Sequence, residues 1–191
     1  LDRAIRDRRL QAREDEQHDS LVDSIYTDRL TGLRNRRYLL DRLQEEIEKA
    51  HRYEYPVACA VLDLDDLEPV DAEIGAASLD DIMVELALTL RDSSRMYDLI
   101  ARYDGTLFVA VLPHAELENA MGYANKIVST VGATTYSDMT FPTRAQLRVG
   151  LVGWHREKAR GADYVLGEAM RALLQAKSLD GKRVIARQLT A

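Results

Sequence analysis

The sequence predicts an α/β sandwich, in which helices flank a mixed central sheet and a further helix precedes it. Segments with helical spacing alternate with short β-type runs, one run is apolar almost throughout, and an Asp-Gly dipeptide joins two others. The chain has 191 residues, of which 46% are hydrophobic and 30% are charged. This length and composition indicate one well-buried domain plus an extension.

Residues 1–26 form the predicted extension. They are rich in charge, lack Gly and Pro, and hold only sparse apolar positions, namely Ile5, Leu10, Leu21, Val22 and Ile25. We expect a solvated helix that gains order by pairing with a second copy or by continuing an upstream coiled coil, and a frayed linker is the alternative. The predicted domains are therefore a signalling helix over 1–26 and a globular part over 27–191.

The first half of the globular part begins with an amphipathic helix from about Arg36 to Arg52, which Pro56 ends. The run "VACAVLDLDD" (57–66) is typical of a strand covered on both faces, and helical spacing returns over 79–92. "DLIARY" and "TLFVAVL" flank Asp104-Gly105, a dipeptide suited to the positive φ angles of a two-residue hairpin turn.

The second half contains a predicted helix over 117–131, then a loop with Gly132 and Pro142, and a strand over 145–154. A helix over 162–178, a turn at Asp180-Gly181 and a short strand over 183–188 complete the chain.

Charge and cysteine content narrow the function classes. The formal net charge is -6, which argues against a nucleic-acid-binding surface because phosphate neutralisation needs a basic face. The single Cys59 lies in an apolar run, so we expect burial as a small hydrophobe, and one cysteine excludes a disulfide framework. No run reaches the ~18 apolar residues of a membrane span. We expect a cytoplasmic protein, or the cytoplasmic part of a larger, membrane-attached one.

Carboxylates follow the first predicted strand within eleven residues and without an intervening cation: Asp63, Asp65, Asp66, Glu68, Asp71 and Glu73. Carboxylates at the end of a strand suit Mg²⁺, whereas a solvated acidic loop is the alternative. An EF-hand is excluded because Glu68 stands where that loop needs Gly. The hairpin turn, which would lie close to this strand end if the two strands are neighbours, offers only Asp104 as an acid, followed by Thr106 and Leu107.

Two motifs give the sequence a family resemblance. "DRLTGLRNRRYL" resembles the D-x-L-T-G-L-x-N-R-R motif of GGDEF domains, the diguanylate cyclases, and "RYDGTLF" stands in the place of their R-Y-G-G-D-E-F signature. The similarity runs from about Asp28 to Ile185. It implies the mixed-sheet fold of nucleotidyl cyclases. It also implies condensation of two GTP into cyclic di-GMP with Mg²⁺, between two domains that each hold one nucleotide.

The departures from this family pattern predict an inactive, degenerate domain over 27–191. In the signature, Asp104 replaces the first Gly, Gly105 is kept, and Thr106 and Leu107 replace the two acids. A Thr hydroxyl cannot serve as a carboxylate base near neutral pH. Asp63 matches a metal-binding Asp, Asp80 a guanine-contacting Asp and Lys177 a family Lys. Other family positions have changed, at Glu68, Asp71, Ala76, Leu79 and Gly181. We expect no cyclase chemistry and no required cofactor, with Mg²⁺ at Asp63 only if GTP still binds.

The resemblance also implies a product site. Arg95 and Asp98 stand five residues before the signature, as does the family's inhibitory R-x-x-D pair, and Lys126 falls where family sites add a cation. A guanidinium can fork onto phosphate or the acceptor edge of guanine, and a carboxylate accepts from the guanine N1 and N2 donors. A local ion pair at a helix end is the alternative reading of Arg95 and Asp98.

These observations predict a catalytically inactive cyclic di-GMP receptor in bacterial signalling. Its expected partners are cyclic di-GMP, a second copy of the chain, bound through the N-terminal helix or bridged by ligand, and fused or interacting sensor and output domains, without nucleic acid. Two alternatives stay open. One is a ligand-independent dimerisation or interaction module. The other is a residual GTP site or cyclase that uses Asp63, Asp80 and Lys177.

Overall fold

The computed structural model describes residues 24–68, 76–138, 141–155 and 161–189. Its helices are α2 (Arg36–Tyr53), α3 (Ala76–Asp92), α4 (Leu117–Ala133) and α5 (Ala162–Ser178). Its strands are β1 (Val57–Glu68), β2 (Leu99–Asp104), β3 (Leu107–Pro113), β4 (Thr135–Asp138), β5 (Phe141–Trp154) and β6 (Val184–Gln188). Most of the predicted helix over 1–26 lies outside the described residues, although residues 24–26 are helical. None of the helices in the described ranges has the length and apolarity to cross a bilayer.

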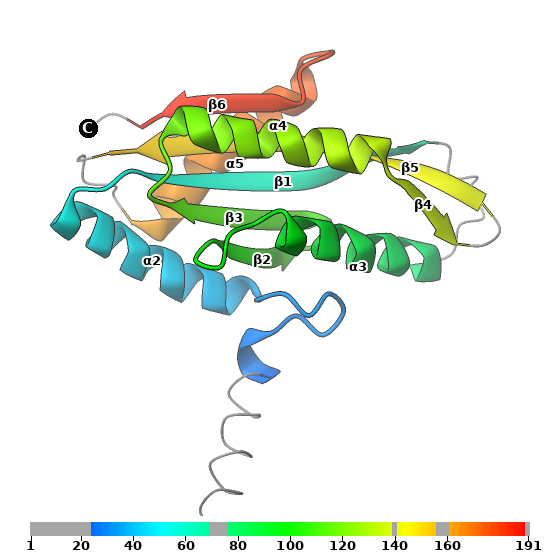
Figure 1. Cartoon of the computed structure of the whole chain (residues 1–191), viewed down its shortest axis with the longest axis horizontal. Coiled ribbons are helices and arrows are strands. Elements are labelled where there is room, and N and C mark those ends of the chain that lie inside the picture. Colours follow the sequence, from blue (N-terminus) through cyan, green and yellow to red (C-terminus); the bar gives the residue numbers. More distant parts are fainter. Residues whose placement is uncertain (1–23, 69–75, 139–140, 156–160, 190–191) are drawn as a thin grey trace, which may run out of the picture.

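The described strands form one mixed sheet in the order β2-β3-β1-β5-β4, with β6 paired to β5. β1 is antiparallel to both β3 and β5, whereas β6 is parallel to β5. Helices lie on both faces, with α3 and α4 in front of the sheet and α5 behind it in Figure 1. The predicted fold class is therefore confirmed.

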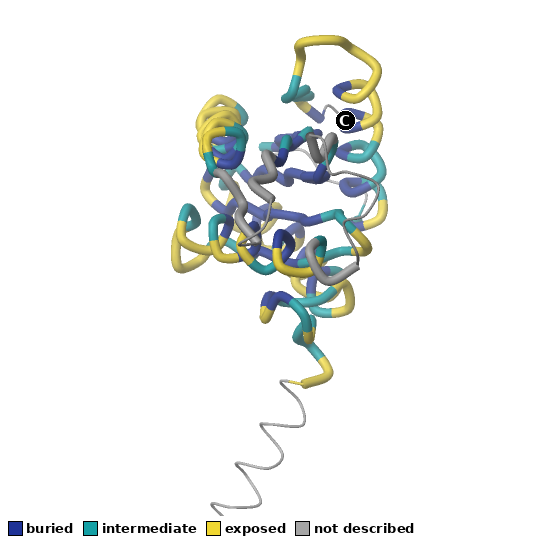
Figure 2. Tube along the Cα trace, turned by 90° about the vertical axis from the view of Figure 1, so that its right-hand side faces the viewer, coloured by how far each residue is buried: buried dark blue, intermediate teal, exposed yellow. Residues whose placement is uncertain are grey.

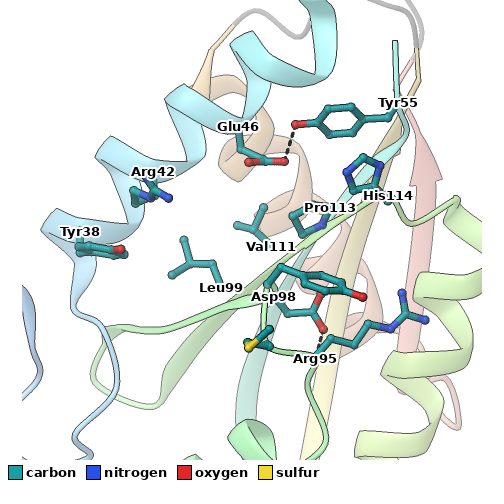
Figure 3. A pocket seen from close by; sticks show the side chains of 12 residues that line it. Tyr38, Arg42, Glu46, Tyr55, Arg95, Asp98, Leu99, Val111, Pro113 and His114 are labelled. Carbon is teal, nitrogen blue, oxygen red and sulfur yellow. Dashed lines mark hydrogen bonds between the residues drawn. The ribbon is translucent and has the colours of Figure 1, made fainter. Parts of the chain in front are cut away.

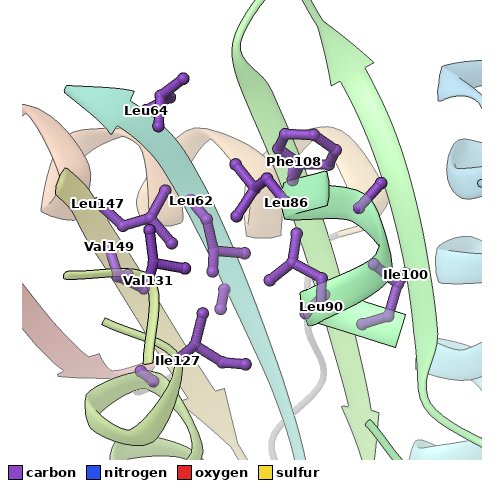
Figure 4. Packing of buried hydrophobic residues seen from close by; sticks show 14 of the residues in the cluster. Leu62, Leu64, Leu86, Leu90, Ile100, Phe108, Ile127, Val131, Leu147 and Val149 are labelled. Carbon is purple, nitrogen blue, oxygen red and sulfur yellow. The ribbon is translucent and has the colours of Figure 1, made fainter. Parts of the chain in front are cut away.

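The central strand β1 explains the two-layer core. Its alternate residues point to opposite faces: Ala58, Ala60 and Leu62 pack with α3 and α4, whereas Val57, Cys59 and Val61 pack with α2 and α5. Figure 4 shows the first of these layers, with Leu86, Leu90 and Ile127 of the helices facing the strands. Figure 2 shows that the buried residues lie in the interior of the domain, whereas the exposed residues lie on its outer sides. Cys59 is fully buried as predicted, and burial raises the pKa of its thiol to about 12.

The backbone of helix α5 lies directly against the sheet at Gly150. A Cβ at this position would lie 2.1 Å from the carbonyl oxygen of Ala169 and 2.2 Å from the amide nitrogen of Leu173. Only a residue without a side chain lets the helix backbone rest on β5 here. This contact positions the end of α5, which carries Lys177.

Two expectations are wrong in detail. The predicted loop after 131 is mostly structured, because α4 runs to Ala133 and β4 pairs with the first residues of β5. Pro142 was expected in this loop, but it lies in β5 and pairs with Ser137 of β4. The last β5 residue that pairs with β1 is Arg144. The missing N–H of Pro142 therefore removes no hydrogen bond between β5 and the central strand.

The predicted hairpin is confirmed, but its turn lies one residue later than expected. β2 ends at Asp104 and β3 begins at Leu107, so the turn residues are Gly105 and Thr106. Gly105 has a φ of 49°, whereas Asp104 is not among the positive-φ residues. A register shift between Arg102 and Asp104 adds the extra residue to β2. Glycine at the first turn position is what a type II′ hairpin requires.

Candidate functional site

A tight turn between α3 and β2 carries the predicted product-site pair. The Arg95 amide donates to Asp98 Oδ2 at 2.7 Å, and the Asp98 amide donates to the Arg95 carbonyl at 3.1 Å. The carboxylate is thus joined to Arg95 through its backbone amide, which differs from the side-chain ion pair of the alternative reading. Arg95 is exposed and Asp98 is half-buried. The turn therefore presents a guanidinium beside a carboxylate of fixed position.

Lys126 of α4 meets this pair. Arg95, Asp98 and Lys126 line one pocket of about 270 Å³, together with Asn119 and Tyr123 of α4 and residues around the turn. The structure thus brings together the three side chains that the sequence assigned to one site. Two cations and one carboxylate around a small pocket provide donors for phosphate or carbonyl oxygens and an acceptor for N–H groups.

Burial sets the electrostatics of this pocket. It raises the pKa of Asp98 above its ordinary 3.8, against the opposing influence of the Arg95 amide and charge. Tyr123 is also affected, because burial and the nearby Asp98 charge raise its pKa to about 12 despite a hydrogen bond with Ser94. The Tyr123 and Ser94 hydroxyl oxygens are 2.8 Å apart. Neither residue was predicted from the sequence, although Tyr123 precedes Lys126 by three residues on the same helical face.

The strand-end carboxylates and the hairpin meet in a second place, which we call the Asp63 cluster (Asp63, Asp65, Thr106, Arg148 and Lys177). Thr106 Oγ1 donates to Asp63 Oδ1 at 2.7 Å, and Lys177 Nζ lies 2.5 Å from Asp63 Oδ2. Lys177 Nζ is also 3.7 Å from Asp65 Oδ1, and Arg148 Nε is 2.9 Å from Asp65 Oδ2. Both oxygens of Asp63 therefore face donors from the protein itself.

In the Asp63 cluster, Lys177 and Arg148 neutralise the two carboxylates. Asp63 is buried, with 8% of its surface exposed. Partial burial would lower the pKa of Lys177, but the hydrogen bond and negative charge of Asp63, with those of Asp65, outweigh it and raise the pKa. An ammonium thus lies against the carboxylate that matches the family's metal-binding Asp. The described residues of this cluster do not fit a magnesium ion, because the cation would have to displace Lys177.

The remaining predicted positions are scattered. Asp104 is exposed at the end of β2, and Leu107 pairs with Asp63 across the sheet while packing against the core on the α2 side. Asp80 is exposed on α3, and within the described residues it forms no hydrogen bond or ion pair with the Asp63 cluster. Asp71 and the side chains of Glu68 and Ala76 lie outside the described residues. Leu79 packs against the core, and Gly181 occupies a turn with a φ of 75°.

The motif over 28–37 has a structural role that the sequence analysis did not assign. Asp28 Oδ1 accepts from the Thr31 amide at 2.9 Å and from the Thr31 hydroxyl at 2.7 Å, which closes the loop around Gly32. Arg102 reaches Asp28 Oδ1 at 3.3 Å, and its Nη2 donates to the Gly105 carbonyl at 2.9 Å. Asn35 caps α2 by accepting from the Tyr38 amide at 3.1 Å. The motif therefore ties the start of the domain to the hairpin turn.

Comparison with known proteins settles the family. A family model described as "Diguanylate cyclase, GGDEF domain" matches residues 25–183, which is most of the chain. The chain belongs to the GGDEF family. The diguanylate cyclase DgcP of Pseudomonas aeruginosa is 31% identical over 163 residues, which cover 84% of this chain and 24% of that protein. The response regulator PleD of Caulobacter vibrioides is 31% identical over 119 residues, 62% of this chain and 26% of that protein. The chain thus spans about a quarter of these curated relatives.

Solved structures agree with this GGDEF assignment. Diguanylate cyclase SiaD of Pseudomonas aeruginosa, in complex with its activator SiaC, has a TM-score of 0.79 at 28% identity over 97% of this chain and 70% of that one. The coiled coil and GGDEF domain of DgcB from Caulobacter crescentus, in complex with c-di-GMP, has a TM-score of 0.87 and covers 97% of each chain. At 21% identity, the DgcB likeness shows the fold alone.

Proposed function

We propose that this GGDEF domain binds cyclic di-GMP without synthesising it. The observation that carries this proposal is the pocket lined jointly by Arg95, Asp98 and Lys126. These residues come from a turn and a helix that are far apart in the sequence, and they offer opposite charges to a single ligand. A receptor uses such a site to sense the messenger that related domains make.

The chemistry of the pocket suits a guanine nucleotide. The Asp98 carboxylate accepts from the N1 and N2 donors of guanine, and Arg95 can fork onto the O6 and N7 acceptors or a phosphate. Lys126 supplies a second, point-like cation for a phosphate. The fixed Asp98 position lowers the ordering cost of binding, because the Arg95 amide already holds one of its oxygens.

The closed Asp63 cluster supports the loss of catalysis. Phosphoryl transfer needs carboxylates that hold metal ions and orient the nucleophile. Here Thr106 and Leu107 stand at the two acidic positions of the signature, and Lys177 and Thr106 satisfy Asp63. A GTP triphosphate with Mg²⁺ would have to break these contacts first.

Signalling would proceed by linkage. A ligand that binds one arrangement of two domains better than another shifts the population toward it by the difference in affinity. We place this domain in the cytoplasm, as part of a longer protein whose residues 1–26 pair with a second copy and connect sensor and output domains. The length of the curated relatives, of which this chain spans about a quarter, supports a place within a longer protein.

Isothermal titration tests the proposal. Cyclic di-GMP titrated into the parent should bind with micromolar or tighter affinity. Arg95→Ala should weaken binding about tenfold or more, because a charge-assisted contact is lost. Arg52→Ala is the matched control, since this exposed arginine lies in the last turn of α2 and lines none of the pockets described around the 95–98 turn. Equal binding by the parent and Arg95→Ala, or binding by neither, would overturn the receptor.

The inactive half of the proposal needs a separate assay. The parent incubated with GTP and Mg²⁺ should form no cyclic di-GMP, as measured by chromatography of the products. Product that disappears in Asp63→Ala would establish a residual cyclase instead.

A second candidate is a ligand-independent interaction module. SiaD, a relative at 28% identity, has been solved with an activator protein, which favours protein docking as a use of this fold. A monomer-dimer equilibrium unchanged by any nucleotide would support this module over the receptor.

A further inference from the structure

A larger pocket lies on the other side of the turn that carries Arg95 and Asp98. We call it the aromatic pocket; it has a volume of about 680 Å³ and is lined by Tyr38, Arg42 and Glu46 of α2, and by Tyr55, Tyr97 and His114. Arg95 and Asp98 line this pocket as well as the smaller one with Lys126. Figure 3 shows the α2 side chains on one side, Asp98 and Arg95 on the other, and Tyr55 beside His114.

Tyr55 and His114 form one wall of the aromatic pocket, and their contacts hold both side chains in place. The two ring centroids are 4.0 Å apart with an interplanar angle of 30°. Tyr55 is fixed from behind, because its hydroxyl donates to Glu46 Oε1 at 2.8 Å. His114 has a left-handed backbone with a φ of 55°, a conformation that is uncommon in residues other than glycine. Such strained residues cluster where ligands bind.

The polar groups of the aromatic pocket match guanine. Base stacking on aromatic rings accepts any base, so the base is chosen by the groups at its edges. The Glu46 carboxylate can accept from guanine N1–H and N2–H, where adenine offers no such pair of donors. Arg42, one helical turn before Glu46, can donate to the O6 and N7 acceptors, although its Nη1 now lies 2.5 Å from Glu45 on the exposed side of α2.

The shared turn connects the two pockets. A cyclic dinucleotide has two bases joined through two sugar-phosphate units. A cation between two base pockets, such as Arg95, is therefore placed to bind a phosphate of the ligand. We propose that the aromatic pocket holds the second guanine of the cyclic dinucleotide whose first guanine binds Arg95, Asp98 and Lys126. This inference rests on the proposed function and adds Tyr55, Tyr97, His114 and Glu46 to the ligand contacts.

Titration of cyclic di-GMP into surface variants tests this second base site. Tyr97→Ala, His114→Asn and Glu46→Gln should each weaken binding about tenfold, through lost stacking or a lost charged acceptor. Asparagine is chosen at 114 because it tolerates the left-handed backbone. Tyr53→Ala is the matched control, since Tyr53 is 67% exposed and does not line the aromatic pocket, and it should bind as the parent does. Unchanged thermal melting of each variant shows that the fold is kept.

The outcomes separate this inference from the proposed function. If Arg95→Ala loses binding while Tyr97→Ala, His114→Asn and Glu46→Gln bind like the parent, the receptor stands and the second base site is wrong. If the parent binds no cyclic di-GMP, both fall. The parent should also bind cyclic GMP–AMP about tenfold more weakly than cyclic di-GMP, and equal affinity would overturn guanine recognition in the aromatic pocket.

Discussion

Lys177 Nζ lies 2.5 Å from Asp63 Oδ2, so an ammonium from α5 neutralises the buried carboxylate in the second half of β1. Thr106 donates to the other oxygen of the same carboxylate. Both carboxylate oxygens of Asp63 are thus satisfied by side chains of the chain itself.

Lys177→Met should lower the free energy of unfolding by about 1–2 kcal/mol at neutral pH. It leaves Asp63 buried with one donor fewer, while the partial exposure of Lys177 moderates the loss. Because the folded-state pKa of Lys177 is raised above its ordinary 10.5, its stabilising effect is fully present below that pH and is lost as the pH rises through the folded-state value. Urea unfolding across alkaline pH measures this difference. Lys182→Met, at an exposed position, is the control; an equal effect from both would contradict the role of the ion pair.

Asp28→Ala should destabilise the domain by about 1–2 kcal/mol, because Thr31 and Arg102 lose a shared acceptor. Partial burial would raise the pKa of Asp28, but the Thr31 hydrogen bonds and the Arg102 charge outweigh it and lower the pKa below 3.8. The stabilisation is therefore present above pH 3.8 and is lost as the pH falls through the folded-state value. Urea midpoints of the parent and variant should converge in acid. Asp41→Ala, an exposed change on α2, should leave stability nearly unchanged.

The sequence predicted those features that depend on local periodicity. The unbroken apolar run of β1 and the spacing of α2 through α5 gave the sandwich, and Cys59 lies in the core as expected. The sequence pattern was ambiguous where a single residue decides the geometry. The extra residue in β2 places the hairpin turn one position later than expected, and Pro142 made the β4–β5 pairing look like a loop.

Contacts between distant segments could not be read from the chain alone. Spacing relative to the family motif assigned Arg95, Asp98 and Lys126 to one site, and the fold brings them to one pocket. By contrast, the pairing of Lys177 with Asp63 and the stacking of Tyr55 on His114 depend on how α5 and the end of β3 pack. No local pattern carries that information.

Cyclic di-GMP affinity should fall in acid because Asp98 becomes protonated. Burial raises the pKa of this carboxyl above 3.8, so it becomes protonated at a higher pH than an ordinary Asp and then loses its acceptor role toward guanine N–H groups. Titrations at descending pH should show that affinity declines as the pH falls toward the raised pKa of Asp98. Asp98→Asn should bind more weakly at neutral pH, with a flatter profile. Parallel profiles for the two proteins would exclude Asp98 as the titrating group.

Gly150→Ala should destabilise the domain by about 3 kcal/mol, since its Cβ would meet the backbone of α5 at Ala169 and Leu173. Gly167→Ala is the matched control in α5, where an added Cβ meets nothing within 4 Å and a helical Ala should stabilise by up to about 1 kcal/mol. Urea unfolding of the two variants gives the comparison. Equal stability of the two would contradict the close helix–strand contact.

An amide NMR titration of the parent with cyclic di-GMP in the presence of Mg²⁺ tests the central claim most directly. We expect saturable shifts for the turn at Arg95–Asp98 and for Tyr123 and Lys126 on α4, with the amides of Asp63, Thr106 and Lys177 unchanged. Shifts confined to the Asp63 cluster, or no shifts at all, would contradict it.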